Sequence, residues 1–247
     1  MRGRCIPLSP TRRIVCDFMR MSRDVPTIPI ERPMALGRLV AARDAARERL
    51  PWSAIFMKAY ALTAAEMPVL RRAYVRFPTA HLYEYGESVA SIAVERDYRG
   101  EPGVFVTRIR APEALSLGLI GAAIRHAASA PVETIRPFRK LLLIARLPAP
   151  LRAVIWWMAL NVGRWRGHHI GTFGISVVSS LGADVTHVRS PMTVLLNYGV
   201  IAPEGPTIVR FVFDHRVLDG AVAARALARL EEILTGPILA EIEADRR

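Results

Sequence analysis

A histidine followed four residues later by an aspartate is the pair in this sequence best suited to chemistry. His215 and Asp219 stand in TIVRFVFDHRVLDGAVAARAL, residues 207–227, where an apolar run of β-forming residues ends and a helical pattern begins. An imidazole at the end of a buried strand lies in partly desolvated surroundings, which favour its neutral form. Because a general base must be neutral before it accepts a proton, we predict this role for His215.

Asp219 is predicted to shape the loop rather than to react. Asp219-Gly220 makes a tight exit from the strand, and the aspartate is placed to cap the helix that follows. We expect its carboxylate to fix the loop through an arginine, either Arg216 or one near the N-terminus. The alternative interpretation is structural, with His215 an ordinary core histidine and Asp219 an ordinary cap.

The elements that would position this pair belong to a mixed α/β domain spanning residues 1–247. Residues 208–213 are apolar apart from one arginine, which predicts a strand buried on both faces. Helical patterns occur at 9–19, 35–50, 51–67, 116–128 and 221–234, and an amphipathic helical region covers 131–167. Strand patterns occur at 27–34, 81–97, 103–109, 171–181, 193–201 and 207–215.

The charge is strongly positive, with a formal net charge of +12 and only two lysines, Lys58 and Lys140. Such a charge attracts phosphate-bearing ligands such as coenzyme A, nucleic acid or an anionic membrane. The arginines are scattered along the chain, so we favour a dispersed basic surface. We expect no nucleic-acid partner, because no binding motif accompanies the charge.

The cysteines, the apolar runs and the histidines bear on the cellular compartment and on metal binding. Cys5 and Cys16 are too few for a secreted disulfide scaffold, which indicates reduced thiols in a cytoplasmic protein. No run of apolar residues is long enough for a signal peptide or a membrane-spanning helix. His168 and His169 are adjacent but lack the further ligands of a metal site, so we expect no metal.

The stretch FDHRVLDGA, residues 213–221, resembles the signature of the dihydrolipoamide acyltransferases, which form the cores of 2-oxo acid dehydrogenase complexes. It is also similar to the His-x-x-x-Asp-Gly motif of chloramphenicol acetyltransferase and its superfamily. LSPTRRIVCDFMRMSRDVPTIPI, SAIFMKAYALTAAEMPVLRRAY and GTFGISVVSSLGADV resemble further segments of that family, in the expected order. The resemblance thus extends over nearly the whole chain.

This resemblance implies a two-layer fold, with a mixed sheet covered by helices on one side, in a trimer whose active sites lie between subunits. It implies that His215 is the general base, and that Asp219 maintains the site through a salt bridge. A serine of the neighbouring subunit would donate a hydrogen bond to the oxyanion. One alignment selects Ser179 and another selects Ser176, on opposite faces of a predicted strand; we prefer Ser179, with Ser180 and Ser176 behind it.

The implied reaction moves an acyl group between a thioester and a thiol or hydroxyl acceptor. A coenzyme A thioester would be the co-substrate, and a small molecule or a lipoyl group would be the acceptor. We expect no lipoyl or subunit-binding domain in this chain, so lipoamide would come from another chain. Cores of the family assemble such trimers into cages through their C-terminal residues, but the charged C-terminus here favours a free homotrimer over a larger assembly. The alternative is a non-catalytic scaffold that retains the fold.

One segment, 136–169, has no counterpart that we can assign in the family. It carries Trp156, Trp157 and Trp165 among basic residues. It would line an acyl channel, present a basic amphipathic face to a membrane, or simply pack against the rest of the domain. Membrane contact through 136–167 is the less favoured of these interpretations.

Overall fold

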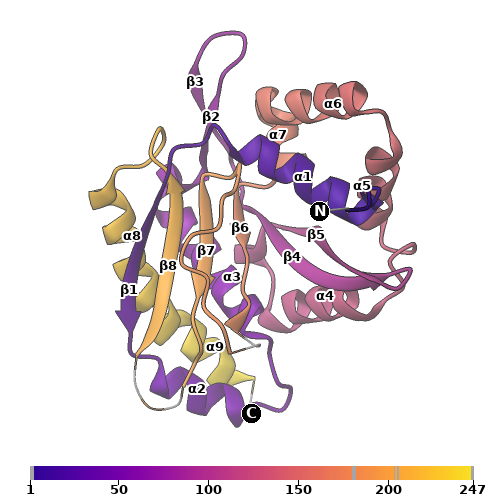
Figure 1. Cartoon of the computed structure of the whole chain (residues 1–247). Coiled ribbons are helices and arrows are strands. Elements are labelled where there is room, and N and C mark those ends of the chain that lie inside the picture. The colour runs from indigo at the N-terminus through magenta and orange to yellow at the C-terminus, as the bar shows by residue number, and fades with distance from the viewer. Residues whose placement is uncertain (1–2, 180–181, 203, 205, 246–247) are drawn as a thin grey trace.

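A mixed sheet lies at the centre of the molecule (Figure 1). The computed structural model describes residues 3–179, 182–202, 204 and 206–245. In these residues the sheet has six strands in the order β1-β8-β7-β6-β4-β5, and β6 runs parallel to both β7 and β4, whereas the other pairs are antiparallel. The strands are β1 (Thr27–Met34), β4 (Val89–Tyr98), β5 (Glu101–Arg110), β6 (Phe173–Ile175), β7 (Val194–Tyr198) and β8 (Thr207–Asp214). A separate hairpin joins β2 (Arg72–Val75) to β3 (His81–Glu84).

Helices cover the sheet unevenly. The main layer, which carries most of the core, packs α3, α4 and α8 against one face, while α1 crosses the other face near one end of the strands (Figure 1). The helices are α1 (Pro10–Ser22), α2 (Gly37–Asp44), α3 (Trp52–Glu66), α4 (Leu117–Ser129), α5 (Arg136–Arg146), α6 (Ala149–Asn161), α7 (Gly163–His169), α8 (Gly220–Ile233) and α9 (Leu239–Ala244). Short 3-10 segments occur at Pro68–Arg71 and Pro112–Ala114, and a π turn at Leu234–Ile238 precedes α9.

Strand β8 is buried on both faces, as its apolar sequence predicts. Phe211 and Phe213 belong to the main core with α3 and α8, and neither side chain is more than 1% exposed. Val212 points to the opposite face, where it joins Leu195 and residues of α1 and α6. A strand enclosed in this way has a fixed register, because a slip by one residue would exchange its two buried faces.

The glycines of the GTFG motif allow the close packing around β6. Gly171 has φ +99°, and a Cβ there would lie 2.6 Å from Ser91 Oγ. At Gly174 a Cβ would lie 2.5 Å from the Met192 methyl carbon. Both positions therefore require glycine, the first for its backbone conformation and the second for its neighbours.

Several elements differ from the sequence-based expectation. The helix expected over 35–50 is α2 alone, and the strand pattern at 81–97 divides into β3 and β4. Strand β2, which the sequence analysis did not predict, follows directly on a 3-10 segment. Strand β6 ends at Ile175, well short of the expected residue 181, because the Asn197 amide takes the Ser176 carbonyl in place of a ladder bond.

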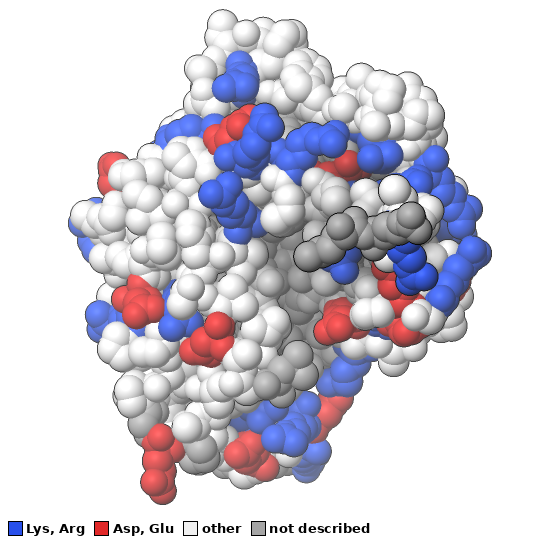
Figure 2. All heavy atoms as spheres, in the orientation of Figure 1, with Lys and Arg blue, Asp and Glu red and all other residues white. Residues whose placement is uncertain are grey.

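The basic surface is not uniform on the face shown in Figure 2. Lysine and arginine side chains gather in a band across its upper part, over α1 and α5, with acidic groups between them, whereas the lower part carries both signs more evenly. In the described part of the chain, no helix is both long and apolar enough to cross a membrane.

A buried ion pair attaches α1 to α6. The Asp17 carboxylate, on a side chain only 2% exposed, accepts hydrogen bonds from Arg152 Nε at 2.7 Å and from Trp156 Nε1 at 3.1 Å. A buried carboxylate without its positive partner lowers the stability of the fold, and so does a buried guanidinium without its negative partner. This pair therefore holds the segment 136–169 to the N-terminal helix.

We predict that Asp17→Asn lowers the free energy of unfolding by about 3 kcal/mol, because the buried Arg152 guanidinium then has no counter-charge. Urea denaturation measures the loss. The matched control is Asp24→Asn, which removes an exposed partner of Arg23 and should change stability by less than about 0.5 kcal/mol. Equal effects of the two substitutions would contradict this assignment.

Candidate active site

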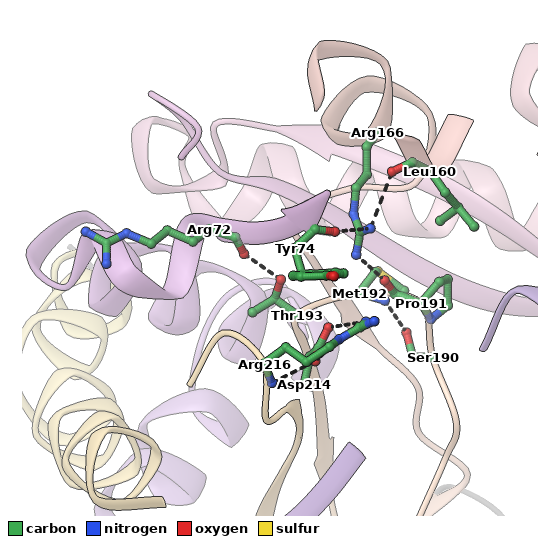
Figure 3. Close-up of polar contacts among 10 residues, drawn as sticks. All are labelled: Arg72, Tyr74, Leu160, Arg166, Ser190, Pro191, Met192, Thr193, Asp214 and Arg216. Atoms are coloured by element: carbon green, nitrogen blue, oxygen red, sulfur yellow. Dashed lines mark hydrogen bonds and ion pairs between the residues drawn. The ribbon is translucent and has the colours of Figure 1, made fainter. Parts of the chain in front are cut away.

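Strand β8 ends in a buried carboxylate held by an arginine of the following turn (Figure 3). Asp214 is 0% exposed, and its two oxygens accept from Arg216 Nε at 2.9 Å and from an Arg216 terminal nitrogen at 2.7 Å. The Arg216 backbone N–H donates to the same carboxylate at 3.0 Å. Three bonds between residues two apart in the chain close the turn tightly.

Contacts with Tyr74 and Arg166 surround this ion pair. The Arg216 guanidinium lies 4.3 Å from the centre of the Tyr74 ring. Arg166, from α7, donates to the carbonyl oxygens of Tyr74 and Pro191 at 2.9 and 2.6 Å (Figure 3). Burial lowers the pKa of the Arg166 guanidinium, an effect that Tyr85 and Asp214 partly oppose. The ion pair and these contacts thus connect β2, α7, the loop before β7 and the end of β8.

His215 follows directly on this clamped residue. Its backbone N–H donates to Pro26 O at 3.0 Å, and its Nδ1 lies 3.0 Å from Leu218 O. A carbonyl oxygen can only accept, so Nδ1 carries the hydrogen, and in the neutral ring Nε2 is left with its lone pair. No described residue hydrogen-bonds Nε2. The ring is therefore presented as a proton acceptor with fixed orientation.

The surroundings of His215 differ from the expectation. We expected partial desolvation, but 44% of the side chain is exposed in the single chain. The strand is buried and so is Leu218 beyond it, but the His215 side chain between them projects toward solvent. What restrains the ring is the bond to Leu218 O and the edge of Phe213, whose ring centre lies 5.8 Å away.

Asp219 occupies the N-cap position of α8, as expected, but its side chain makes no capping hydrogen bond there. The expected salt bridge to Arg216 is absent, because Arg216 is bound to Asp214 instead. Asp219 is 84% exposed, and its nearest ionisable contact is His215 Nδ1 at 3.9 Å. Among the described residues, Asp219 is therefore an exposed side chain at the edge of the candidate site.

The candidate serines lie at the opposite end of the sheet. Ser176 and Ser179 follow β6, and residues 176–178 have no regular secondary structure, so the expected alternation of strand faces does not apply to them. Ser179 lines a pocket of about 540 Å³ together with Trp52, Ser53 and Tyr198. Ser180 lies outside the described residues.

The length of β7 separates the two parts of the site. Val194 pairs with Phe213 at the His215 end, and Tyr198 borders the Ser179 pocket at the other end. Five strand residues span about 16 Å at roughly 3.3 Å each. One chain therefore does not bring His215 and Ser179 together.

Sequence reasoning overlooked Asp214, Arg166 and the role of Arg216. The signal for Asp214 was present, since an acidic residue ending a buried apolar strand needs a counter-charge nearby. Arg216, two residues after Asp214, is that counter-charge, but the sequence pattern pairs it with Asp219 instead. Among the described residues, no group of three or more His, Cys, Asp or Glu side chains is arranged to hold a metal ion; the rings of His168 and His169 lie 4.7 Å apart.

We predict that Arg216→Met destabilises the protein by about 3 kcal/mol, because it leaves the Asp214 carboxylate buried without a counter-charge. Adding Asp214→Asn should recover most of this loss, since the amide oxygen still accepts from the turn backbone. Denaturant unfolding of the single and double variants measures both effects. An additive double variant would show that the pair is not coupled.

Comparison with known proteins gives structural but not sequence matches. No protein-family model matches the chain, and no curated protein matches it. Dihydrolipoamide acetyltransferase of Azotobacter vinelandii superimposes with a TM-score of 0.67 at 20% identity, covering 96% of this chain and 94% of that one. The truncated catalytic core of the 2-oxoacid dehydrogenase complex of Thermoplasma acidophilum gives 0.67 at 20% identity, covering 95% and 99%. The cubic core of a pyruvate dehydrogenase complex gives 0.64 at 19% identity, covering 96% and 94%.

The fold is therefore that of an acyltransferase catalytic core. More particularly, it is the fold of the dihydrolipoamide acetyltransferases, over almost the full length of both chains. This confirms the fold predicted from FDHRVLDGA and its companion segments. At identities of 20% or less the likeness establishes the fold, and the activity is a separate inference.

Proposed function

We propose that the protein is an acyltransferase that moves an acyl group from a thioester, acyl-coenzyme A or acyl-lipoamide, to a thiol or hydroxyl acceptor. The observation that carries the proposal is the state of His215: its Nδ1 is committed to Leu218 O and its Nε2 is free. That arrangement suits a general base, whose lone pair must be available and correctly aimed. The fold neighbours, which are named as acyltransferases, support the same class of reaction.

In the proposed reaction, His215 Nε2 removes the proton from the acceptor S–H or O–H as the sulfur or oxygen attacks the thioester carbonyl. The tetrahedral oxyanion accepts a hydrogen bond from the Ser179 hydroxyl. Collapse of this intermediate breaks the C–S bond, and the departing thiolate takes the proton back from the imidazolium.

We further propose that each site is completed by two subunits of a homotrimer. His215 and Ser179 lie at opposite ends of the sheet in one chain, so a histidine end and a serine end must come from neighbouring copies. A closed cyclic trimer supplies three identical pairings of this kind. The neighbours named as cores of multienzyme complexes are consistent with such assembly, and larger assemblies remain within the proposal.

The Azotobacter vinelandii enzyme supports the assignment of residue types. A serine, a histidine and an asparagine four positions beyond that histidine have been investigated there for roles in catalysis. This chain has a carboxylate, Asp219, at the corresponding spacing from His215. We assign Asp219 to the architecture of the assembled site rather than to proton transfer, because it approaches Nδ1 and not Nε2.

Arginines near the His215 end suit a phosphate-bearing co-substrate. Arg20, Arg76 and Arg216 line a pocket of about 190 Å³ next to the Asp214 turn. Positive charge there would attract the phosphates of coenzyme A. Coenzyme A is therefore the thioester carrier we favour, with lipoamide supplied by another chain as the second choice.

We predict that His215→Ala lowers the rate of acyl transfer by about 100- to 10,000-fold, because the acceptor loses its base. The free energy of unfolding should change by no more than about 1 kcal/mol, since the side chain makes one hydrogen bond to a carbonyl and is 44% exposed. Thiol release from acyl-coenzyme A measures the activity. Full activity in the folded variant would exclude His215 as the base, and a wild-type protein inactive with every thioester and acceptor would favour a scaffold.

We predict that two inactive variants, His215→Ala and Ser179→Ala, complement each other when their subunits are mixed. In a cyclic trimer that contains both variants, one of the three interfaces joins an intact histidine to an intact serine, so about a third of the sites in mixed trimers regain both groups. Co-expression with two different tags isolates the mixed oligomers for assay. Mixed oligomers without restored activity would show that the two groups do not meet across an interface.

A further inference from the structure

A cluster of basic side chains surrounds one pocket of the described structure. This basic pocket, of about 850 Å³, is lined by Arg108, Arg110, Arg136, Lys140 and Arg164. The one carboxylate in its wall, Glu87, is paired with Arg110. In the described part of the chain, no acidic side chain lies within ion-pairing distance of the other four cations. The pocket is therefore a concentrated positive site without a matching negative one.

The histidines that line the basic pocket are affected by the same positive charges. The pKa values of His168 and His169 are both lowered, first by burial and then by neighbouring cations, among them Arg108 and Lys140. A bound anion would remove this mutual repulsion. Charge complementarity thus favours an anionic occupant.

The back wall of the basic pocket is preformed. The rings of Tyr83 and Tyr85 pack in a tilted arrangement, 4.9 Å between ring centres, and Tyr85 Oη donates to Gly163 O at 2.9 Å. Helix α7 presents glycines to these rings: a Cβ at Gly163 would lie 2.4 Å from Tyr83, and one at Gly167 would lie 2.6 Å from Tyr85. The pocket therefore requires small residues in α7 and is not a chance gap between side chains.

A second, apolar pocket opens from the same walls. This apolar trough, of about 350 Å³, lies between α5 and α6 and is lined by Leu143, Ile144, Ile155, Trp156 and Met158. Arg108, Lys140 and Trp165 line both the trough and the basic pocket, so the two adjoin, and together they are called the groove below. Pockets of these sizes fit small-molecule ligands.

We propose that this groove binds an amphiphilic anion, with its phosphate or carboxylate head in the basic pocket and its alkyl or acyl chain in the apolar trough. We favour a single dispersed molecule over a membrane surface as the occupant, because the cations line a recess that adjoins the trough. The groove lies beside β4 and β5, three strands away from β8, which is about 14 Å at roughly 4.8 Å per strand. It is thus a site separate from His215, and Figure 1 shows that its helices α5–α7 gather at that end of the molecule.

The probe is decyl phosphate below its micelle-forming concentration, titrated calorimetrically into the intact protein. Binding should weaken roughly tenfold for each two methylenes removed from the chain, because each buried methylene contributes to the transfer free energy. Inorganic phosphate, the head alone, should bind far more weakly. A decyl glycoside, the chain with an uncharged head, should bind far more weakly too.

Matched variants separate the head site from the chain site. Lys140→Ala should weaken decyl phosphate binding about ten- to a hundredfold, whereas Arg139→Ala, on the same helix but outside the groove, should leave it unchanged. Leu143→Gln in the trough should weaken binding, and Leu151→Gln should not, although the two leucines are similarly exposed, at 54% and 53%. His215→Ala should bind decyl phosphate like the wild type. The binding measurement therefore tests the groove even if the proposed acyl transfer is not found.

Three outcomes would overturn the proposal. Equal binding of inorganic phosphate would mean that the trough takes no chain, and equal binding of the glycoside would mean that the cations take no head. Binding to vesicles of anionic phospholipid without binding to dispersed decyl phosphate would mean that the segment is a membrane-facing surface instead. Chain-length dependence together with loss in Lys140→Ala would establish the site.

Discussion

The Asp214 carboxylate has no exposure to solvent, and the structure around the candidate active site depends on how its charge is neutralised. An ionised carboxylate at the end of a buried strand is stable only if it is paired and hydrogen-bonded. Arg216 supplies both requirements from two residues away, and this forces the chain into a closed turn. His215, between the two, consequently leaves the strand in one direction with its backbone bonded to the loop before β1.

The turn then determines the chemistry of the ring. Because the chain curls back at Leu218, its carbonyl oxygen meets Nδ1 and fixes which nitrogen keeps the proton. The acid that follows, Asp219, is left outside this arrangement and exposed in the single chain. The serine end of the sheet, some 16 Å away along β7, supplies nothing to this histidine within one subunit. The division of the site between two ends of one sheet is therefore the physical basis for assigning it to an interface.

The sequence predicts the strongly patterned elements well and the side-chain pairings poorly. Strand β8, helix α8 and the glycines before β6 are apparent because burial on both faces, helical periodicity and tight packing each leave a local signal. The end of β6 leaves none: the strand stops where a side chain, Asn197, takes over a backbone carbonyl. Likewise, the choice of Arg216 between two carboxylates depends on which one is buried, and spacing alone does not reveal that.

The Asp214–Arg216 turn fixes the tautomer of the His215 ring, with the hydrogen on Nδ1 and the lone pair on Nε2. The most direct measurement is the nitrogen NMR spectrum of histidine-labelled protein, with the His215 signals assigned by their loss in His215→Ala. We expect, for the neutral ring, a protonated Nδ1 and an unprotonated Nε2. A neutral ring protonated on Nε2 would contradict it, because the lone pair would then face Leu218 O and no base would face the acceptor.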